Sequence, residues 1–377
     1  MANRPAIDFI FFDAGGGHRA AATALESVIR AQNRPWDIRL VDLQDVLDEL
    51  DIFRKLTGLR LEDIYNRLLE NGWTLGSTQL LPLMHGVIRL YHPAQVRVLA
   101  KFWGARPPDM VVSLVPNFDR SMWQALQKVN PRIPFVTVLT DMADYPPHFW
   151  IERQKQIFIC GTDKAQQQVR EISPESSSHR VSGMILNPKF YEVPPVDVAA
   201  ERGKLGLDPA RPTGLMLFGG MGSEKMGDIL ARVDASPLDV QLILICGKNE
   251  KLRQRLAERP TRIAKFVEGF TREVPRYMQL ADFFIGKPGP GSISEAIHMG
   301  LPVIVEKNAW TLPQERFNAD WVAEQNLGES LGTFGDIVPA LQRTLAPERL
   351  AELRKNVASV QNRAIFEVTD LLQTFLG

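Results

Sequence analysis

The stretch IDFIFFDAGGGHRA, residues 7–20, contains an apolar run, three consecutive glycines and the beginning of a helical pattern. The apolar run Ile7–Phe12 predicts a buried strand, and residues 18–31 predict the helix that follows it. Glycines at such a junction let the backbone approach a ligand, and the helix start presents free N–H groups. The stretch therefore predicts the first β–α unit of a parallel sheet, with a ligand site at the end of its strand.

The same alternation continues along the chain and then restarts. The first series of expected strands is Ile38–Val41, Met110–Leu114, Phe135–Leu139 and 157–160, with a helix at 119–129. Proline-containing segments at 193–196 and 208–212 suggest a connector. The second series is Leu215–Phe218, Val240–Cys246, Phe283–Ile285 and Val303–Val305. This pattern predicts an α/β protein with two Rossmann-like domains.

The predicted domains are an N-terminal domain at 1–195 and a C-terminal domain at 196–347. Residues 348–377 are expected to form C-terminal helices, which in a two-domain chain can cross back to the first domain. Residues 43–108 interrupt the alternation with an apolar segment. From Asn71 to Pro108 there is no acidic residue, whereas Arg89, Arg97, Lys101 and Arg106 are basic. Such a segment suits an anionic lipid surface, but apolar residues at helical spacing usually pack inward.

Composition limits the classes of function. The chain has 377 residues with 44 Lys and Arg against 44 Asp and Glu, so its zero net charge argues against a nucleic-acid partner. Cys160 and Cys246 follow apolar runs and are expected to be buried free thiols. Asp8 and Asp13 interrupt the apolar N-terminal run, which argues against a signal peptide. No apolar stretch of the sequence approaches the length of a transmembrane helix. We therefore expect a cytoplasmic protein that could still bind a membrane surface.

His18 is the candidate catalytic base in the first glycine stretch. A helix N-terminus disfavours the charged imidazole, and a neutral imidazole can accept a proton from a hydroxyl. Asp13, on the other side of the turn, could orient the ring. An alternative is a dinucleotide fingerprint formed by Gly15, Gly17 and Ala20, with Asp42 as the ribose-binding acid, although His18 would then stand in the path of the pyrophosphate.

The second informative stretch is GKPGPGSISEA, residues 286–296. A strand ends there, a Gly/Pro turn follows, and Ser292 is expected to start a helix whose first N–H groups form an anion site. Glu295, one turn further on, could bind the two hydroxyls of a ribose. The structural alternative is a capping box formed by Ser292 and Glu295.

Three weaker stretches complete the candidate sites. Phe218–Ser223 is a further strand–glycine–helix junction, and Pro313–Asn318 carries amide and acid groups of the kind that bind sugar hydroxyls. Asp141 and Asp144 with His148 are compatible with a metal site, but a polar loop is the favoured interpretation. No Asp-x-Asp pair and no His/Cys cluster at metal spacing is present in the sequence, so no metal is expected.

These motifs, in this order, resemble the GT-B glycosyltransferases, and more closely the monogalactosyldiacylglycerol synthases and processive diacylglycerol glucosyltransferases. The likeness covers nearly the whole chain. Asp13–Ala20 resembles their amino-terminal signature, and Gly289–Ala296 resembles their nucleotide-sugar signature. Gln314, Glu315 and Asn318 resemble the motif that follows, and Asp141 with His148–Trp150 resembles a further stretch of the family.

The resemblance implies an inverting, metal-independent transfer of galactose or glucose from a UDP-hexose, the substrate rather than a cofactor, to a diacylglycerol-type lipid. It implies that His18 is the base, assisted by Asp13, and that residues 43–108 face the acceptor and the cytoplasmic face of an anionic membrane. The implied acceptor loop comprises Gly15, Gly16, Gly17 and Asp141. The implied donor-binding residues are Gly219, Gly220, Gly222, Ser223, Phe270, Gly289, Gly291, Ser292, Glu295, Gln314 and Glu315.

One departure from the family concerns the phosphates. The family carries an arginine where this sequence has Asn187, and Lys189 is a possible replacement. The alternative functions are a UDP-sugar 2-epimerase of the same fold, a nicotinamide-dependent oxidoreductase, and a non-catalytic lipid or nucleotide binder. The choice of hexose, the exact acceptor and the oligomeric state are left open.

Overall fold

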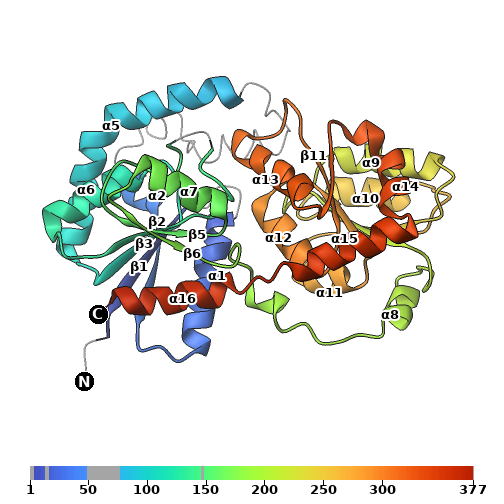
Figure 1. Cartoon of the computed structure of the whole chain (residues 1–377), viewed down its shortest axis with the longest axis horizontal. Coiled ribbons are helices and arrows are strands. Elements are labelled where there is room, and N and C mark those ends of the chain that lie inside the picture. Colours follow the sequence, from blue (N-terminus) through green and yellow to red (C-terminus); the bar gives the residue numbers. More distant parts are fainter. Residues whose placement is uncertain (1–3, 13–16, 49–76, 146–147, 377) are drawn as a thin grey trace. The chain divides into compact units, whose positions relative to one another are not determined.

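The computed structural model describes residues 4–12, 17–48, 77–145 and 148–376. The chain forms two compact units (Figure 1). The first unit consists of Met1–Pro188, Leu312–Gln314 and Asn362–Gly377, and the second consists of Lys189–Thr311 and Glu315–Gln361. The main division therefore follows Pro188, shortly before the proline-containing segment at 193–196.

The first unit is built on a six-stranded parallel sheet with the order β2-β1-β3-β4-β5-β6. Its strands are β1 (Ala6–Phe11), β2 (Asp37–Asp42), β3 (Met110–Ser113), β4 (Phe135–Val138), β5 (Ile157–Cys160) and β6 (Ser177–Arg180). Its helices are α1 (Gly17–Ala31), α2 (Leu43–Leu47), α5 (Ser77–Ala105), α6 (Asp119–Val129), α7 (Asp163–Ile172) and α16 (Ala364–Phe375). The central strands β3 and β4 are buried along their whole length, as expected for a parallel sheet covered on both faces.

Helix α16 lies beside α1, although more than 300 residues separate them in the sequence (Figure 1). Arg34 forms an ion pair with Asp370, and the buried residues Ile365, Val368 and Leu372 line the inner face of α16. The C-terminal helix thus completes the first unit, whereas the preceding α15 packs on α12 and α14 of the second.

Helix α5 divides its two faces between core and solvent. Val96, Leu99 and Trp103 are buried at helical spacing, and the Trp103 indole donates to the Asp8 carboxylate on β1 at 3.0 Å. The opposite face carries Arg97 and Lys101, both exposed. The inward-packing interpretation of residues 43–108 therefore holds for one face of α5. Residues 49–76 lie outside the described part of the chain.

The second unit contains another six-stranded parallel sheet, with the order β12-β11-β10-β7-β8-β9. Its strands are β7 (Thr213–Leu217), β8 (Gln241–Ile245), β9 (Lys265–Glu268), β10 (Phe283–Gly286), β11 (Val303–Glu306) and β12 (Gly328–Leu331). Its helices are η2 (Pro188–Phe190), α8 (Val198–Lys204), α9 (Lys225–Ala235), α10 (Glu250–Glu258), α11 (Val274–Gln279), α12 (Pro290–His298), α13 (Pro313–Glu324), η3 (Phe334–Asp336), α14 (Ile337–Thr344) and α15 (Pro347–Ser359). Relative to its first strand β7, this is the strand order of a Rossmann fold.

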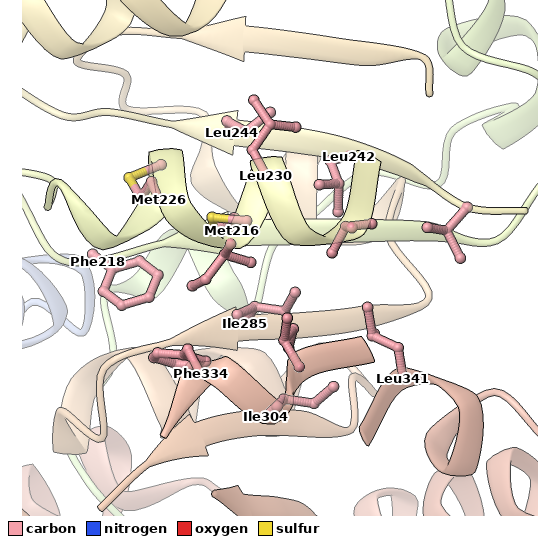
Figure 2. Close-up of a cluster of buried hydrophobic side chains, with 14 of the residues drawn as sticks. Met216, Phe218, Met226, Leu230, Leu242, Leu244, Ile285, Ile304, Phe334 and Leu341 are labelled. Atoms are coloured by element: carbon pink, nitrogen blue, oxygen red, sulfur yellow. The ribbon is translucent and has the colours of Figure 1, made fainter. Parts of the chain in front are cut away.

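A continuous apolar core lies between one face of this sheet and its helices (Figure 2). Met216, Leu242 and Ile285 point from the strands towards Leu230 of α9 and Leu341 of α14. The alternate strand residues are also buried, so both faces of the sheet are covered, as a parallel sheet requires.

The two predicted Rossmann-like domains are confirmed as two parallel-sheet units. Three strands lacked a sequence signal, namely β6, β9 and β12. All three are edge strands whose side chains are largely polar or only half-buried, so their sequences show no apolar run.

Candidate active site

Each sheet has one point at which its strand order reverses. In the first unit this point lies between β1 and β3, and in the second it lies between β7 and β10. Ligands of open parallel sheets bind outside the carboxyl ends of the strands at such a point. The glycine-rich stretches follow β1, β7 and β10, so the candidate residues lie where the topology favours a ligand.

His18 is the second residue of α1 and its side chain is half-buried. Its Nδ1 lies 3.0 Å from Oγ1 of Thr140, which follows β4. Desolvation lowers the pKa of His18 from 6.5 to about 4, although a hydrogen bond with the Leu114 backbone acts in the opposite direction. The imidazole is therefore neutral at pH 7, in the state in which it can accept a proton.

Trp150 packs close to His18, and their ring centroids are 6.0 Å apart. The buried indole donates to Oδ2 of Asp141 at 2.9 Å. Asp144 accepts from the backbone N–H groups of His148 and Trp150, and desolvation raises the pKa of Asp144 to about 6. Both carboxylates therefore hydrogen-bond groups of their own loop, which favours the polar-loop interpretation over a metal site. Asp141 holds an aromatic ring beside His18.

Part of the predicted first site lies outside the described residues, namely Asp13, Gly15 and Gly16. Gly17 is the first residue of α1, and a Cβ at this position would have no heavy atom within 4 Å. Asp42, the acid of the dinucleotide alternative, caps α2 by accepting from the backbone N–H of Gln44 at 2.9 Å. This capping role gives Asp42 a structural function at the end of β2.

The glycine turn after β7 packs tightly against the turn after β8. Gly219 and Gly222 have positive φ values of 77° and 64°, and a Cβ on Gly222 would lie 2.7 Å from the Cys246 carbonyl oxygen. The Gly220 carbonyl accepts from the Lys248 backbone N–H at 2.8 Å. Ser223 accepts at Oγ from the backbone N–H of Lys225, the first residue of α9. Glycine is therefore required here by backbone conformation and close approach.

Helix α12 starts earlier than the sequence suggested. Its N-cap is Gly289, which makes no side-chain capping bond, and Pro290 is its first residue. The capping-box interpretation of Ser292 and Glu295 is therefore wrong, because Pro290 with its fixed φ begins the helix. The N–H of Ile293 bonds to the Gly289 carbonyl, so by helix geometry the N–H groups of Gly291 and Ser292 are those without an intrahelical partner.

Glu295 lies in the second turn of α12 and is half-buried. Desolvation raises the pKa of its carboxyl group from 4.5 to about 7. Near neutral pH the group therefore passes between a proton donor and a charged acceptor, and either form can hydrogen-bond a hydroxyl.

Helix α13 holds the turn between β10 and α12. Glu315, which is buried, accepts from Nζ of Lys287 at 2.8 Å, and Asn318 donates from Nδ2 to the Pro288 carbonyl at 2.8 Å. Gln314, one residue earlier, is half-buried. Glu315 and Asn318 lie three residues apart on α13 and thus hold Lys287 and Pro288, two successive residues of the loop between β10 and α12.

The remaining predicted residues are Phe270, shortly after β9, and Lys189, within η2. Phe270 is 60% exposed, and Nζ of Lys248 lies 6.0 Å from its ring centroid. Lys189 pairs with Glu273 at 3.4 Å, and both side chains are more than half exposed. The Phe270 ring, with the Lys248 ammonium group beside it, forms an exposed surface of the kind on which a planar base stacks.

No cluster of three potential metal ligands occurs among the described residues. Cys160 and Cys246 are buried free thiols, as the sequence predicted, and desolvation raises their thiol pKa values to about 12 and about 11. Neither thiol is therefore ionised near neutral pH.

Thr140, Trp150 and Lys287 contact candidate residues, but sequence reasoning assigned none of them a role. Thr140 and Trp150 lie in the stretch that resembles the family, yet their proximity to His18 arises only when β1, β3 and β4 align. Lys287 had one usable signal, a cation just ahead of a helix N-terminus, where the helix dipole disfavours positive charge.

Comparisons with known proteins define the class. Residues 218–316 match the glycosyltransferase family 28 C-terminal domain. The structure of MurG from Acinetobacter baumannii superposes with a TM-score of 0.62 at 12% identity, covering 99% of this chain and 100% of that one. The chain has the GT-B fold, and part of its second unit is similar to a glycosyltransferase C-terminal domain.

The sequence relatives are more specific. The chain is similar to monogalactosyldiacylglycerol synthase 1 of Arabidopsis thaliana, with 27% identity over 359 residues. The alignment covers 87% of this chain but 62% of that relative, less than two thirds of its length. A putative UDP-N-acetylglucosamine 2-epimerase from Listeria monocytogenes shares the fold, with a TM-score of 0.57 at 13% identity, covering 96% of this chain and 92% of that one. The fold alone therefore does not separate a transferase from an epimerase.

Among the described residues, no helix is long and apolar enough to cross a membrane.

Proposed function

We propose that the chain is an inverting glycosyltransferase that moves galactose or glucose from a UDP-hexose to a diacylglycerol-type lipid. The observation that carries the proposal is the neutral His18 at the start of α1, held by Thr140 and packed against Trp150. The likeness to a monogalactosyldiacylglycerol synthase supports the lipid acceptor and the hexose.

The first unit would activate the acceptor. His18 accepts the proton of the acceptor hydroxyl, whose oxygen forms a bond to the anomeric carbon of the hexose. The bond between that carbon and the phosphate oxygen breaks, and its electron pair leaves with UDP. A single displacement of this kind inverts the anomeric configuration. Asp13 would assist His18, and no metal is required for these steps.

The second unit would bind the donor. Gly219, Gly220, Gly222 and Ser223 form the turn beneath the nucleotide, and Phe270 offers its exposed face to uracil. The free N–H groups of Gly291 and Ser292 would stabilise negative charge on the departing UDP. Glu295 would bind the ribose, and Gln314 and Glu315 would bind the hexose.

The outer face of α5 would contact an anionic membrane surface. Leu90 is 77% exposed, and Phe102, Arg97 and Lys101 are also exposed. Apolar side chains interleaved with cations favour adsorption to anionic lipid. We therefore expect a peripheral membrane association.

A turnover assay tests the proposal. Purified protein is incubated with anionic liposomes containing diacylglycerol and with UDP-galactose or UDP-glucose in parallel. We expect labelled lipid and an equal amount of UDP with one donor. UDP release without labelled lipid would contradict the acceptor assignment. Conversion of UDP-N-acetylglucosamine without any lipid would instead support the epimerase.

A further inference from the structure

A surface pocket of the first unit gathers three arginines. The pocket has a volume of about 400 Å³ and is lined by Arg89, Arg120, His148, Glu152 and Arg153. Arg89 lies on α5, Arg120 is the second residue of α6, and the other three residues belong to the loop between β4 and β5. Side chains from two helices and one loop, far apart in the sequence, therefore converge on one hollow.

The lining of this pocket carries a positive charge that is not balanced within it. The guanidinium groups of Arg89, Arg120 and Arg153 form no ion pair and no hydrogen bond with the residues that the structure describes. Glu152 is the one carboxylate of the lining, and it too forms no ion pair within the described part of the chain. Three guanidinium groups against one carboxylate leave a net positive charge, which a phosphate group would balance.

The acidic residues closest in sequence to the pocket have other partners. Asp119, next to Arg120, is 1% exposed and accepts from Oγ of Ser113 at 2.6 Å and from Oγ1 of Thr137 at 2.9 Å. Desolvation raises the pKa of Asp119 to about 7, so a proton neutralises part of its charge near neutral pH. Asp144 accepts from the backbone of its own loop. Neither carboxylate therefore pairs with the arginines.

The pocket lies at the same edge of the first sheet as His18. Helix α6 follows β3, and the loop that carries Arg153 follows β4, just as α1 follows β1, so all three begin at the carboxyl ends of parallel strands. His148 is two residues from Trp150, and two residues of chain span at most about 7 Å. The Trp150 and His18 ring centroids are 6.0 Å apart. The pocket and the proposed base therefore border the same loop.

The position on α5 points to a ligand that is held in the membrane. Arg89 directly precedes Leu90, which is 77% exposed and lies on the face of α5 that the proposed function assigns to the membrane surface. Diacylglycerol is uncharged and would leave the arginines without a counter-ion. A glycerophospholipid, in contrast, combines a phosphate group with the same two acyl chains.

We propose that the pocket binds the phosphate of an acceptor lipid, so that the chain also glycosylates a glycerophospholipid whose headgroup carries a free hydroxyl. The inference rests on the proposed function for the donor and the base. The headgroup oxygen forms the bond to the anomeric carbon, and its proton passes to His18. The bond from that carbon to the phosphate oxygen breaks, and its electron pair leaves with UDP. Arg120 and Arg153 hold the lipid phosphate, whereas diacylglycerol reacts at the same base without them.

A competition between two acceptors tests the proposal. Phosphatidylcholine vesicles contain diacylglycerol and phosphatidylglycerol together, and mass spectrometry measures both glycosylated lipids after incubation with UDP-galactose or UDP-glucose. The wild type should form both products. Because the acceptors share one membrane, the product ratio does not depend on how tightly the protein binds the vesicle. Arg120→Gln, Arg153→Gln should lower glycosylated phosphatidylglycerol about 10- to 100-fold relative to glycosylated diacylglycerol, and the retained diacylglycerol product shows that the variant is folded.

The matched control is Arg97→Gln, Lys101→Gln, which removes two cations from the outer face of α5. This control should lower both products together and leave their ratio unchanged. An unchanged ratio in the Arg120, Arg153 variant would overturn the inference alone. The same holds if the wild type glycosylates diacylglycerol but not phosphatidylglycerol.

Inorganic phosphate distinguishes a free anion from a lipid headgroup. If added phosphate alters diacylglycerol transfer by the wild type but not by the Arg120, Arg153 variant, and no glycosylated phosphatidylglycerol forms, the pocket binds a free anion and the inference is overturned. If neither lipid is glycosylated with either donor, the proposed function fails, and the inference with it.

Discussion

The junction of β1 with α1 and the junction of β10 with α12 share one design but differ in charge. Each lies at the carboxyl edge of a parallel sheet, beside the point where strand order reverses, and each follows a glycine-containing stretch. The first presents a desolvated, neutral imidazole between a hydroxyl and an indole. The second presents a lysine, a buried glutamate and free helix N–H groups.

The difference teaches that topology selects the position of a site and the side chains select its chemistry. A neutral group with a lowered pKa is suited to accept a proton, whereas a cation at a helix N-terminus is suited to hold an anion. The two units thus divide the proposed reaction into activation of the acceptor and binding of the donor. The predictions below are ordered from the largest expected effect to the smallest.

Removing the imidazole of His18 should have the largest effect on the rate of lipid glycosylation. His18→Ala should lower the rate of lipid glycosylation by about 10²- to 10⁴-fold, the usual contribution of a general base. The UDP affinity should remain within about twofold of the wild type, because the residues assigned to UDP lie in the other unit. Initial rates and calorimetry on one preparation measure both. Parallel loss of rate and UDP affinity would indicate a structural role for His18.

Reversing charge on the outer face of α5 should separate membrane binding from chemistry. The double variant Arg97→Glu, Lys101→Glu should bind anionic vesicles at least about 30-fold more weakly, because each basic residue contributes about 1 kcal/mol and the introduced carboxylates add repulsion. Vesicle flotation measures the change, and neutral vesicles should show none. The control Lys164→Glu, Arg170→Glu reverses two exposed cations of α7. Equal effects of the two double variants would contradict a specific role for α5.

The raised pKa of Glu295 should make nucleoside binding depend on pH. Its folded-state pKa of about 7 lies above the ordinary 4.5, so the carboxylate predominates only above pH 7. If the carboxylate is the better acceptor for ribose hydroxyls, the uridine affinity should rise by up to about tenfold between pH 6 and pH 8. Uridine is the suitable probe because it carries no titrating phosphate. Glu295→Gln should abolish the pH dependence, and a persistent dependence would assign it to another group.

Removing the hydrogen bond between Thr140 and His18 should have the smallest effect on the rate of lipid glycosylation. Thr140→Val removes the hydroxyl while keeping the shape, and should lower kcat about three- to tenfold. Thr140→Ser should restore most of the loss, with KM for the donor unchanged in both. A change in donor KM instead of kcat would show that Thr140 does not act through His18.

The sequence predicted the two parallel sheets because their central strands are apolar runs followed by glycines. It did not predict β6, β9 or β12, whose half-buried edges lack such runs. The start of α12 was misplaced because Ser292 and Glu295 imitate a capping box, although Pro290 begins the helix. The sequence pattern could not predict contacts between residues far apart in the chain, because such contacts depend on the strand order. Examples are His18 with Thr140 and Lys287 with Glu315.

The pH dependence of kcat/KM for the lipid acceptor, measured at saturating UDP-hexose so that the pH-dependent binding of the nucleoside through Glu295 does not contribute, tests the central claim, that the first unit supplies a neutral imidazole as the base. Because the folded-state pKa of His18 is lowered to about 4, the active neutral form is present throughout the neutral range and is lost only as pH falls towards 4. The account predicts a rate that is constant between pH 6 and pH 8 and has its acidic inflection near pH 4. An acidic inflection near 6.5, the value of an unperturbed histidine, would contradict it.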